Sequence, residues 1–251
     1  MNSEYILETR ELTKEFKGFI AVNGVNLKVR RGSIHALIGP NGAGKTTCFN
    51  LLTHFLEPTR GRIFFKGQEI TGSKSSAIAR AGLVRSFQIS AVFPHLTVLE
   101  NVRVALQGKR GGSFDFWRSE RTLDELNDRA RELLAAVGLS DFEGAVAVDL
   151  PYGRKRALEI ATTLALDPEM MLLDEPTAGM THVDVERISA LIKRVAANRT
   201  VLMVEHNLSV VSNLSDRITV LQRGEILAEG DYDSVSKNPD VIEAYLGKGQ
   251  T

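Results

Sequence analysis

The chain has 251 residues, which is long enough to bury a substantial core as one large domain or as a domain with an attached lobe. Its 31 basic and 31 acidic side chains cancel, which argues against a dedicated nucleic-acid binder, because no excess positive charge is available to displace counterions from a phosphate backbone. A single cysteine, Cys48, excludes an internal disulfide framework and fits a reducing compartment.

The N-terminal residues carry no targeting pattern. Met1 to Leu12 lacks a basic region followed by an apolar core, so a secretory signal is not expected. No window approaches the run of about 18 apolar residues that a membrane span needs. We therefore expect any membrane role to come through a partner.

An aromatic residue lies between the strands predicted at the start of the chain. Ile6, Leu12 and the alternation at 25–29 predict these strands, and Phe16 lies in the polar loop segment 14–18. Phe16 could belong to a minor apolar cluster, which its sequence context alone favours. It could instead be a ring on which a nucleobase stacks.

A glycine-rich segment follows the apolar run 34–38 and fits the P-loop pattern G-x-x-x-x-G-K-[ST]. Its glycines let backbone N–H groups wrap a triphosphate closely, and a helix predicted at 47–52 points its N-terminus at the phosphates. Lys45 would add a positive charge beside the β- and γ-phosphates, and the hydroxyl of Thr46 would bind Mg²⁺. The residues expected to hold the nucleotide are Gly39, Pro40, Asn41, Gly42, Ala43, Gly44, Lys45, Thr46 and Thr47.

The middle of the chain is mostly helical. The predicted elements are, in order, a strand at 62–66, a helix at 73–80, a strand at 83–87, a helix at 97–106 and a helix at 118–137. Thr97 and Glu100 form a capping box, and Gly138 ends the last of these helices. Gln88 is either a solvated residue at a strand end or the start of a contact segment that continues to Pro94. We interpret residues 88–165 as a helical lobe inserted between 1–87 and 166–251.

The remainder of the chain alternates strands with helices. Strands are predicted at 170–173, 201–204, 218–221 and 225–228, helices at 183–195 and 208–214, and one or two short helices at 232–246. The strands are apolar without polar alternation, which implies strands buried on both faces, as in a parallel sheet covered by helices.

Two acidic residues directly follow the strand predicted at 170–173. In a P-loop protein this strand lies beside the P-loop strand, so Asp174 and Glu175 would emerge at the carboxyl edge of the sheet near the γ-phosphate. Asp174 would then hold Mg²⁺ through water, and Glu175 would polarise the attacking water. The alternative is a solvated acidic turn before Pro176, which the presence of a P-loop disfavours.

His206 stands at the end of the next predicted strand, 201–204. A histidine there is more often a surface residue, but on a neighbouring strand of the same sheet it can reach the γ-phosphate. The interval from Asp174 leaves room for the single crossover helix that a βαβ unit requires.

Taken in order, these motifs resemble the ATPase subunits of ABC transporters over nearly the whole chain. They are the P-loop, Gln88 in Ser86-Phe87-Gln88, the segment Leu150-Pro151-Tyr152-Gly153-Arg154 (the signature-like loop), the pair Asp174-Glu175, and His206. The resemblance implies an α/β fold: a P-loop NTPase core with a mainly parallel sheet, an antiparallel β subdomain and an inserted α-helical lobe. It places the nucleotide-binding core in 1–87, the lobe with Gln88 and the signature-like loop in 88–165, and the rest of the core in 166–251.

The resemblance also implies a dimer that holds two ATP molecules between its subunits. Pro151, Tyr152 and Gly153 of one subunit would contact the nucleotide bound to the P-loop of the other. Phe16 would stack on the adenine, whereas its sequence context alone favoured a place in a minor apolar cluster. Residues implied in catalysis are Glu175, His206, Lys45 and Gln88, and those implied in holding Mg²⁺ are Thr46, Gln88 and Asp174.

Further segments resemble the subfamily that imports branched-chain amino acids; relatives that import urea or short amides share much of this pattern. The segments are Phe87-Gln88, Phe93-Pro94, Leu96 to Val102, Leu158 to Ala161, Val204-Glu205-His206 and Ile242 to Gly247. This implies a cytoplasmic ATPase subunit, peripheral on the inner face of the cell membrane. Its partners would be a second ABC ATPase subunit, identical or not, integral membrane permease subunits and, indirectly, a periplasmic or surface solute-binding protein, with no nucleic acid.

Two alternative functions stay open at this point, and three residues depart from the family pattern. One is a non-transport ABC ATPase acting on nucleic acid, and the other is a regulatory subunit that binds ATP with little turnover. Pro151 stands where the family usually has a serine, Arg154 replaces a glutamine, and Thr181 replaces Asp or Asn. Loss of the serine hydrogen bond to the partner's γ-phosphate would cost about 1.5 to 3 kcal/mol, which Arg154 would partly offset by its charge. We therefore expect slow intrinsic hydrolysis.

Overall fold

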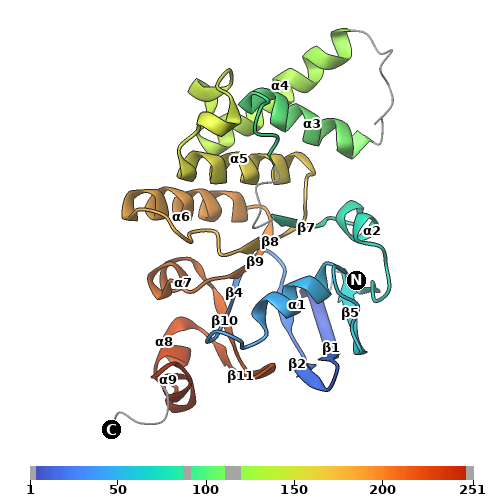
Figure 1. Ribbon diagram of the computed structural model, residues 1–251, viewed down its shortest axis with the longest axis vertical. Coiled ribbons are helices and arrows are strands. Elements are labelled where there is room, and N and C mark those ends of the chain that lie inside the picture. The colour runs from blue at the N-terminus through green and yellow to red at the C-terminus, as the bar shows by residue number, and fades with distance from the viewer. Residues whose placement is uncertain (1–3, 87–91, 111–119, 247–251) are drawn as a thin grey trace.

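The computed structural model describes residues 4–86, 92–110 and 120–246 (Figure 1). The strands are β1 Tyr5–Phe16, β2 Phe19–Val25, β3 Lys28–Arg30, β4 Ile34–Ile38, β5 Arg60–Phe65, β6 Gln68–Glu69, β7 Leu83–Ser86, β8 Met170–Asp174, β9 Thr200–Val204, β10 Arg217–Gln222 and β11 Glu225–Gly230. The α-helices are α1 Lys45–Leu52, α2 Ser75–Arg80, α3 Val98–Arg110, α4 Glu120–Val137, α5 Tyr152–Ala165, α6 His182–Ala196, α7 Leu208–Leu214, α8 Tyr232–Ser236 and α9 Pro239–Leu246. Two 3₁₀ turns, η1 Ser140–Phe142 and η2 Ala147–Asp149, precede α5.

A six-stranded sheet in the order β11-β10-β4-β9-β8-β7 forms the centre of the molecule. All its neighbours pair in parallel except β10 and β11. The prediction that β8 lies beside the P-loop strand β4 is wrong, because β9 lies between them and pairs with both. An apolar strand can hydrogen-bond to either neighbour, so its own sequence does not fix its place in the sheet. The acids after β8 and the histidine after β9 nevertheless leave the sheet at the same carboxyl edge.

The two faces of this sheet are covered differently. One face packs its alternate residues, such as Met171 and Met203, against α3 to α7. The other face packs residues such as Leu172 and Leu202 against α1 and a second, antiparallel sheet of order β2-β1-β5-β6, with β3 paired to β1. Helices alone therefore cover one face, whereas α1 and the antiparallel sheet cover the other, and β4, β8 and β9 are buried on both faces, as predicted. Cys48 of α1 is buried in the second cluster, as expected.

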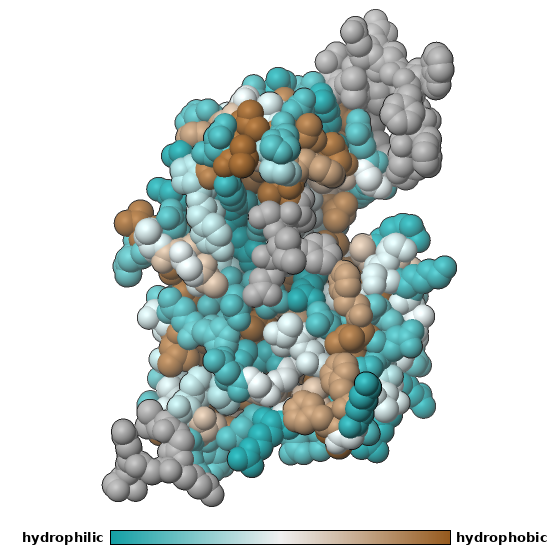
Figure 2. Space-filling view, in the orientation of Figure 1, coloured by the Kyte–Doolittle hydropathy of each residue, from teal (hydrophilic) through white to brown (hydrophobic). Residues whose placement is uncertain are grey.

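Helices α3, α4 and α5 pack on one another at the top of Figure 1, and α6 lies between α5 and the sheet. The capping box forms: the Glu100 carboxylate accepts from the Thr97 amide at 2.7 Å, and the Thr97 hydroxyl accepts from the Glu100 amide at 3.2 Å. Gly138 adopts a φ of 74° directly after α4, as predicted for a C-terminal glycine. Figure 2 shows hydrophobic side chains gathered over this helical layer. Among the described residues, no helix combines the length and apolar character that crossing a membrane requires.

Phe16 lies in a hairpin and not in the predicted loop. It is the last residue of β1 and pairs with Phe19 of β2. Lys17 and Gly18 connect the strands with φ angles of 46° and 90°, and two consecutive positive φ values make the two-residue turn whose twist suits a hairpin. Because of this turn, β1 and β2 stay paired as far as Phe16 and Phe19, within the polar segment that was predicted to be a loop.

Candidate functional site

The P-loop joins the buried strand β4 to α1 through a tightly packed backbone. Gly39, Gly42 and Gly44 have φ angles of 150°, 78° and 101°, which favour glycine. A Cβ on Gly39 would lie 2.2 Å from the carbonyl oxygen of Leu221, and one on Gly44 would lie 2.5 Å from that of Ala21. A Cβ on Gly42 would meet nothing within 4 Å. Two glycines are thus needed for packing within the protein, and the third borders open space.

Lys45 is buried at the start of α1 and lies near both predicted acids. Its ammonium group donates to the carbonyl oxygens of Gly39 at 2.6 Å and Pro40 at 3.0 Å. Burial lowers the pKa of Lys45, whereas the negative charges of Glu175 and Asp174 raise it. The structure therefore brings the P-loop cation and the two carboxylates into one electrostatic neighbourhood.

Glu175 and His206 meet at the carboxyl edge of the six-stranded sheet. Glu175 has a φ of 44°, a conformation that L side chains rarely adopt, and its amide donates to the Val204 carbonyl oxygen at 2.9 Å. The turn points its side chain toward the next strand, where Glu175 Oε1 lies 2.8 Å from His206 Nε2. A carboxylate and an imidazole in contact beside a phosphate-binding loop can orient a water molecule and a terminal phosphate.

Glu205, to which the sequence analysis assigned no role, hydrogen-bonds to the segments that carry Glu175 and His206. Its carboxylate is buried and accepts from the amide and hydroxyl of Thr177 at 3.0 and 2.6 Å, and from the amides of His206 and Asn207 at 3.1 and 3.3 Å. One side chain thus joins the chain after Glu175 to the chain around His206. The available signal was a second ionisable residue at the end of an apolar strand.

Two arginines hold Asp174 and were also missed. Arg85 Nη2 donates to the Asp174 carboxylate at 2.5 Å, and Arg156 Nη2 donates to its backbone oxygen at 2.9 Å. Arg156 also pairs with Glu159 at 2.5 Å inside the protein. For Arg85 the signal in the sequence was a charged residue within the apolar strand predicted at 83–87, since a charged side chain seldom becomes buried unless it is paired.

The oxygen atoms of Thr46 and Asp174 suit a hard divalent cation. Thr46 is exposed on the first turn of α1, and Asp174 carries its carboxylate at the end of β8. The described residues contain no group of three or more His, Cys, Asp or Glu that could form a protein cage around a metal. Mg²⁺ is usually held by one or two protein oxygens together with water and phosphate, so this donor set fits it. Gln88, the third predicted ligand, lies outside the described residues.

The signature-like loop lies at the N-terminus of α5. Pro151 is the N-cap and provides no side-chain hydrogen bond, and Tyr152 is 60% exposed. A Cβ on Gly153 would lie 2.7 Å from Oδ1 of Asp184, a residue of α6. Among the described residues, no hydrogen bond or ion pair links 151–153 to the P-loop. These residues therefore do not complete the site of their own chain through any such bond.

The two other departures from the family pattern have local partners. The Arg154 guanidinium carbon lies 3.8 Å from the centroid of the Phe142 ring. Thr181 is the N-cap of α6, and its hydroxyl donates to the Asp184 carboxylate at 2.9 Å. Asp184 therefore bonds to the start of α6 and lies beside Gly153 of the signature-like loop.

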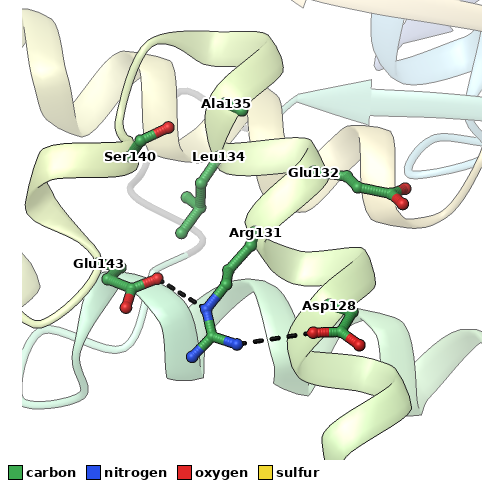
Figure 3. A pocket seen from close by; sticks show the side chains of 7 residues that line it. All are labelled: Asp128, Arg131, Glu132, Leu134, Ala135, Ser140 and Glu143. Carbon is green, nitrogen blue, oxygen red and sulfur yellow. Dashed lines mark hydrogen bonds and ion pairs between the residues drawn. The ribbon is translucent and has the colours of Figure 1, made fainter.

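Phe16 is 41% exposed, and the Lys14 amine lies 5.1 Å from its ring centroid. It is absent from both buried clusters, which disfavours a role in the core. A concavity lies on the helical lobe and is lined by side chains of α4 and of the segment that follows it (Figure 3). Its centre is occupied by Arg131, which pairs with Glu143 at 3.0 Å and Asp128 at 3.6 Å. All its lining residues lie in 128–143, away from the predicted site residues in the sequence.

Comparison with known families decides the identity. Residues 22–178 match the family model described as ABC transporter. The chain belongs to the ABC transporter family. A second family model, described as branched-chain amino acid ATP-binding cassette transporter, matches residues 225–250 of this ABC chain. The family resemblance inferred from the motifs is confirmed.

Similar proteins cover the ABC chain almost completely. It is 43% identical over 256 residues to the high-affinity branched-chain amino acid transport ATP-binding protein BraF of Pseudomonas aeruginosa, covering 98% of this chain and 99% of that protein. It is 40% identical over 253 residues to the corresponding protein LivG of Escherichia coli, covering 98% and 99%. An ATP-binding cassette of an ABC transporter in its ADP conformation superposes with a TM-score of 0.86 at 30% identity, covering 98% of this chain and 100% of that one. The α/β P-loop fold class is confirmed.

Proposed function

We propose that this chain is the ATP-binding and ATP-hydrolysing subunit that energises an importer of branched-chain amino acids. The observation that carries the proposal is the contact of Glu175 with His206 beside Lys45 and Asp174. Full-length similarity to branched-chain amino acid transport ATP-binding proteins, and the family match over 225–250, support the substrate class.

In this proposal the P-loop backbone and Lys45 bind the β- and γ-phosphates of ATP. Thr46, Asp174 and Gln88 hold Mg²⁺, which when bound neutralises phosphate charge. Glu175 orients and polarises the attacking water, and its contact with His206 fixes both side chains before the phosphate arrives. Phe16 is exposed at the hairpin tip and stacks on the adenine.

A second ABC subunit completes the site. Pro151, Tyr152 and Gly153 of one subunit contact the nucleotide on the P-loop of the other, a role that the exposure of Tyr152 at a helix N-terminus supports. A related cassette bound to ADP and phosphate has been solved as a dimer. Closure of this dimer acts on membrane permease subunits through the lobe, and a solute-binding protein delivers the amino acid. The subunit works at the cytoplasmic face of the membrane.

The test is the oligomeric state of Glu175→Gln in the presence of ATP and Mg²⁺. Without the carboxylate that polarises water, hydrolysis stops and the ATP-bound dimer accumulates, visible as a shift to higher mass in size-exclusion chromatography. Glu186→Gln, on the exposed face of α6, is the matched control and should elute as the wild type does. Persistent monomer of Glu175→Gln at saturating ATP and Mg²⁺ would argue against the sandwich dimer.

The substrate class needs a separate experiment. The subunit is reconstituted with its permease and solute-binding protein in vesicles, and ATP hydrolysis is compared with leucine, urea and a short amide as the solute. Leucine alone should stimulate hydrolysis. Stimulation by urea or the amide, with none by leucine, would replace the substrate assignment while leaving the ATPase assignment intact.

A regulatory subunit with little turnover is the second candidate, and Pro151 favours it. This residue caps α5 without any side-chain hydrogen bond, so it offers no hydroxyl to a partner's phosphate. Hydrolysis measured with and without the membrane partners separates the two candidates. ATP binding without turnover in both conditions would support the regulatory role.

A further inference from the structure

The carboxylate of Asp174 is paired with a buried cation. Arg85 Nη2 and Asp174 Oδ2 are 2.5 Å apart, and the two side chains are only 9% and 1% exposed. A carboxylate this deeply buried requires a compensating positive charge, because removal from water is costly for an unpaired ion. Arg85 supplies that charge from β7, where it faces Leu172 of β8 in the parallel register.

Contacts from α1 hold Arg85 in this position. Arg85 Nη1 donates to Asn50 Oδ1 at 2.5 Å, and the guanidinium carbon lies 5.7 Å from the centroid of the Phe49 ring. Within the described residues, Arg85 Nε is buried and lacks a hydrogen-bond partner, so the side-chain hydrogen bonds of the guanidinium are those to Asp174 and Asn50. The P-loop helix and the strand leading to Gln88 are therefore both tied to Asp174.

We propose that Arg85 is a positioning residue that sets the metal affinity of Asp174. This inference rests on the proposed function. The guanidinium is the positive charge that compensates Asp174 when no metal is bound, and Mg²⁺ would take over that part when Mg–ATP is bound. The fixed positive charge repels the incoming cation and occupies one carboxylate oxygen. Arg85 thereby weakens binding of free Mg²⁺ and makes metal binding depend on the additional phosphate ligands of ATP.

The proposal predicts that removing the charge strengthens metal binding and that conserving it leaves metal binding nearly unchanged. Arg85→Met retains the length of the side chain without the charge, so the Mg²⁺ concentration that half-saturates the protein–nucleotide complex should fall at least about tenfold, about 1.4 kcal/mol. Arg85→Lys retains the charge and should stay within about threefold of the wild type. A purely structural role instead predicts that both variants weaken metal binding, because neither methionine nor lysine can contact both Asp174 and Asn50 as the guanidinium does.

Binding is measured with a fluorescent ATP analogue, first in EDTA and then during titration with Mg²⁺, and binding of Mn²⁺ to the protein without nucleotide is measured by electron paramagnetic resonance. Arg31→Met is the matched control, since Arg31 pairs with Glu169 at 3.0 Å on the surface, and it should leave the Mg²⁺ dependence unchanged. Unchanged or weakened metal binding by Arg85→Met would overturn the proposal. Failure of the wild type to bind the analogue at all would instead refute the proposed function.

A second variant covers the case in which Arg85→Met does not fold. Asn50→Ala leaves both ions in place and removes the hydrogen bond that orients Arg85, so the guanidinium should hold Asp174 less firmly. The half-saturating Mg²⁺ concentration should then fall by about threefold, in the same direction as for Arg85→Met. A rise in that concentration for folded Asn50→Ala, checked by circular dichroism, would count against the proposal.

Discussion

Glu205→Gln tests how the segments carrying Glu175 and His206 are held together. The wild-type carboxylate accepts from two donors on Thr177 through Oε1 and from the amides of His206 and Asn207 through Oε2. A glutamine has one acceptor oxygen and one NH₂ group. Whichever way the amide is oriented, its NH₂ group faces at least one backbone N–H that has lost its acceptor.

The cost follows from this count of donors. With the NH₂ group toward Thr177, the hydroxyl can turn to accept from it, and one backbone amide remains unsatisfied. One buried unsatisfied donor costs about 1–3 kcal/mol, so we expect a loss of about 2 kcal/mol in the free energy of unfolding. For a chain of this size the loss corresponds to a fall in Tm of about 4–8 °C. ATP hydrolysis should fall by about tenfold or more, because Glu175 and His206 are no longer fixed relative to each other.

The assay combines thermal unfolding, followed by circular dichroism, with steady-state ATP hydrolysis. Glu186→Gln removes a charge at an α6 side chain that is 70% exposed, and it should change Tm by no more than about 1 °C. The reasoning is refuted if Glu205→Gln unfolds and hydrolyses ATP as the wild type does. A loss of stability with full activity would show that the hydrogen bonds of Glu205 serve folding alone.

Three further predictions concern separate parts of the molecule. Pro151→Ser should hydrolyse ATP about tenfold faster if the missing hydroxyl limits the native subunit, and an unchanged or lower rate in a steady-state assay would remove that explanation. Burial lowers the pKa of His35 from 6.5 to about 4, so the unfolded chain takes up a proton at a higher pH than the folded chain does. Stability should therefore fall by about 3 kcal/mol between pH 6.5 and pH 4, and urea unfolding of His35→Asn should show a weaker dependence over that interval; an equal dependence would exclude His35 as the cause. Gly44→Ala should lower Tm more than Gly42→Ala, because only the former places a Cβ 2.5 Å from a backbone oxygen, and equal losses would contradict the packing argument.

Local signals in the sequence predicted most of the elements. The helix at 208–214 was placed with the bounds it has in the structure, the capping box of Thr97 and Glu100 forms, and Gly138 ends α4. Each of these depends on residues within a few positions of one another, so the sequence alone contains the relevant interactions. The turn at Lys17 and Gly18 is an equally local feature, but the charged residues around it led to the prediction of a loop.

The sequence did not predict which strands, distant from one another in the chain, are neighbours in the central sheet. The sequence located Asp174, Glu175 and His206 at strand ends, yet it wrongly placed β8 beside the P-loop strand. The order of parallel strands depends on how their crossover helices pack, and an apolar strand accepts either neighbour.

By itself, the sequence determined the family, the P-loop, the order of the motifs and most of the helices and strands, because these depend on residue type and short spacing. Only the tertiary structure decided what surrounds the acids: Arg85 and Arg156 on Asp174, and Glu205 between Thr177 and His206. A buried charge is costly unless it is paired, so each of these side chains lies beside a partner. The partner belongs to a segment distant in sequence, and only the fold determines which segment that is.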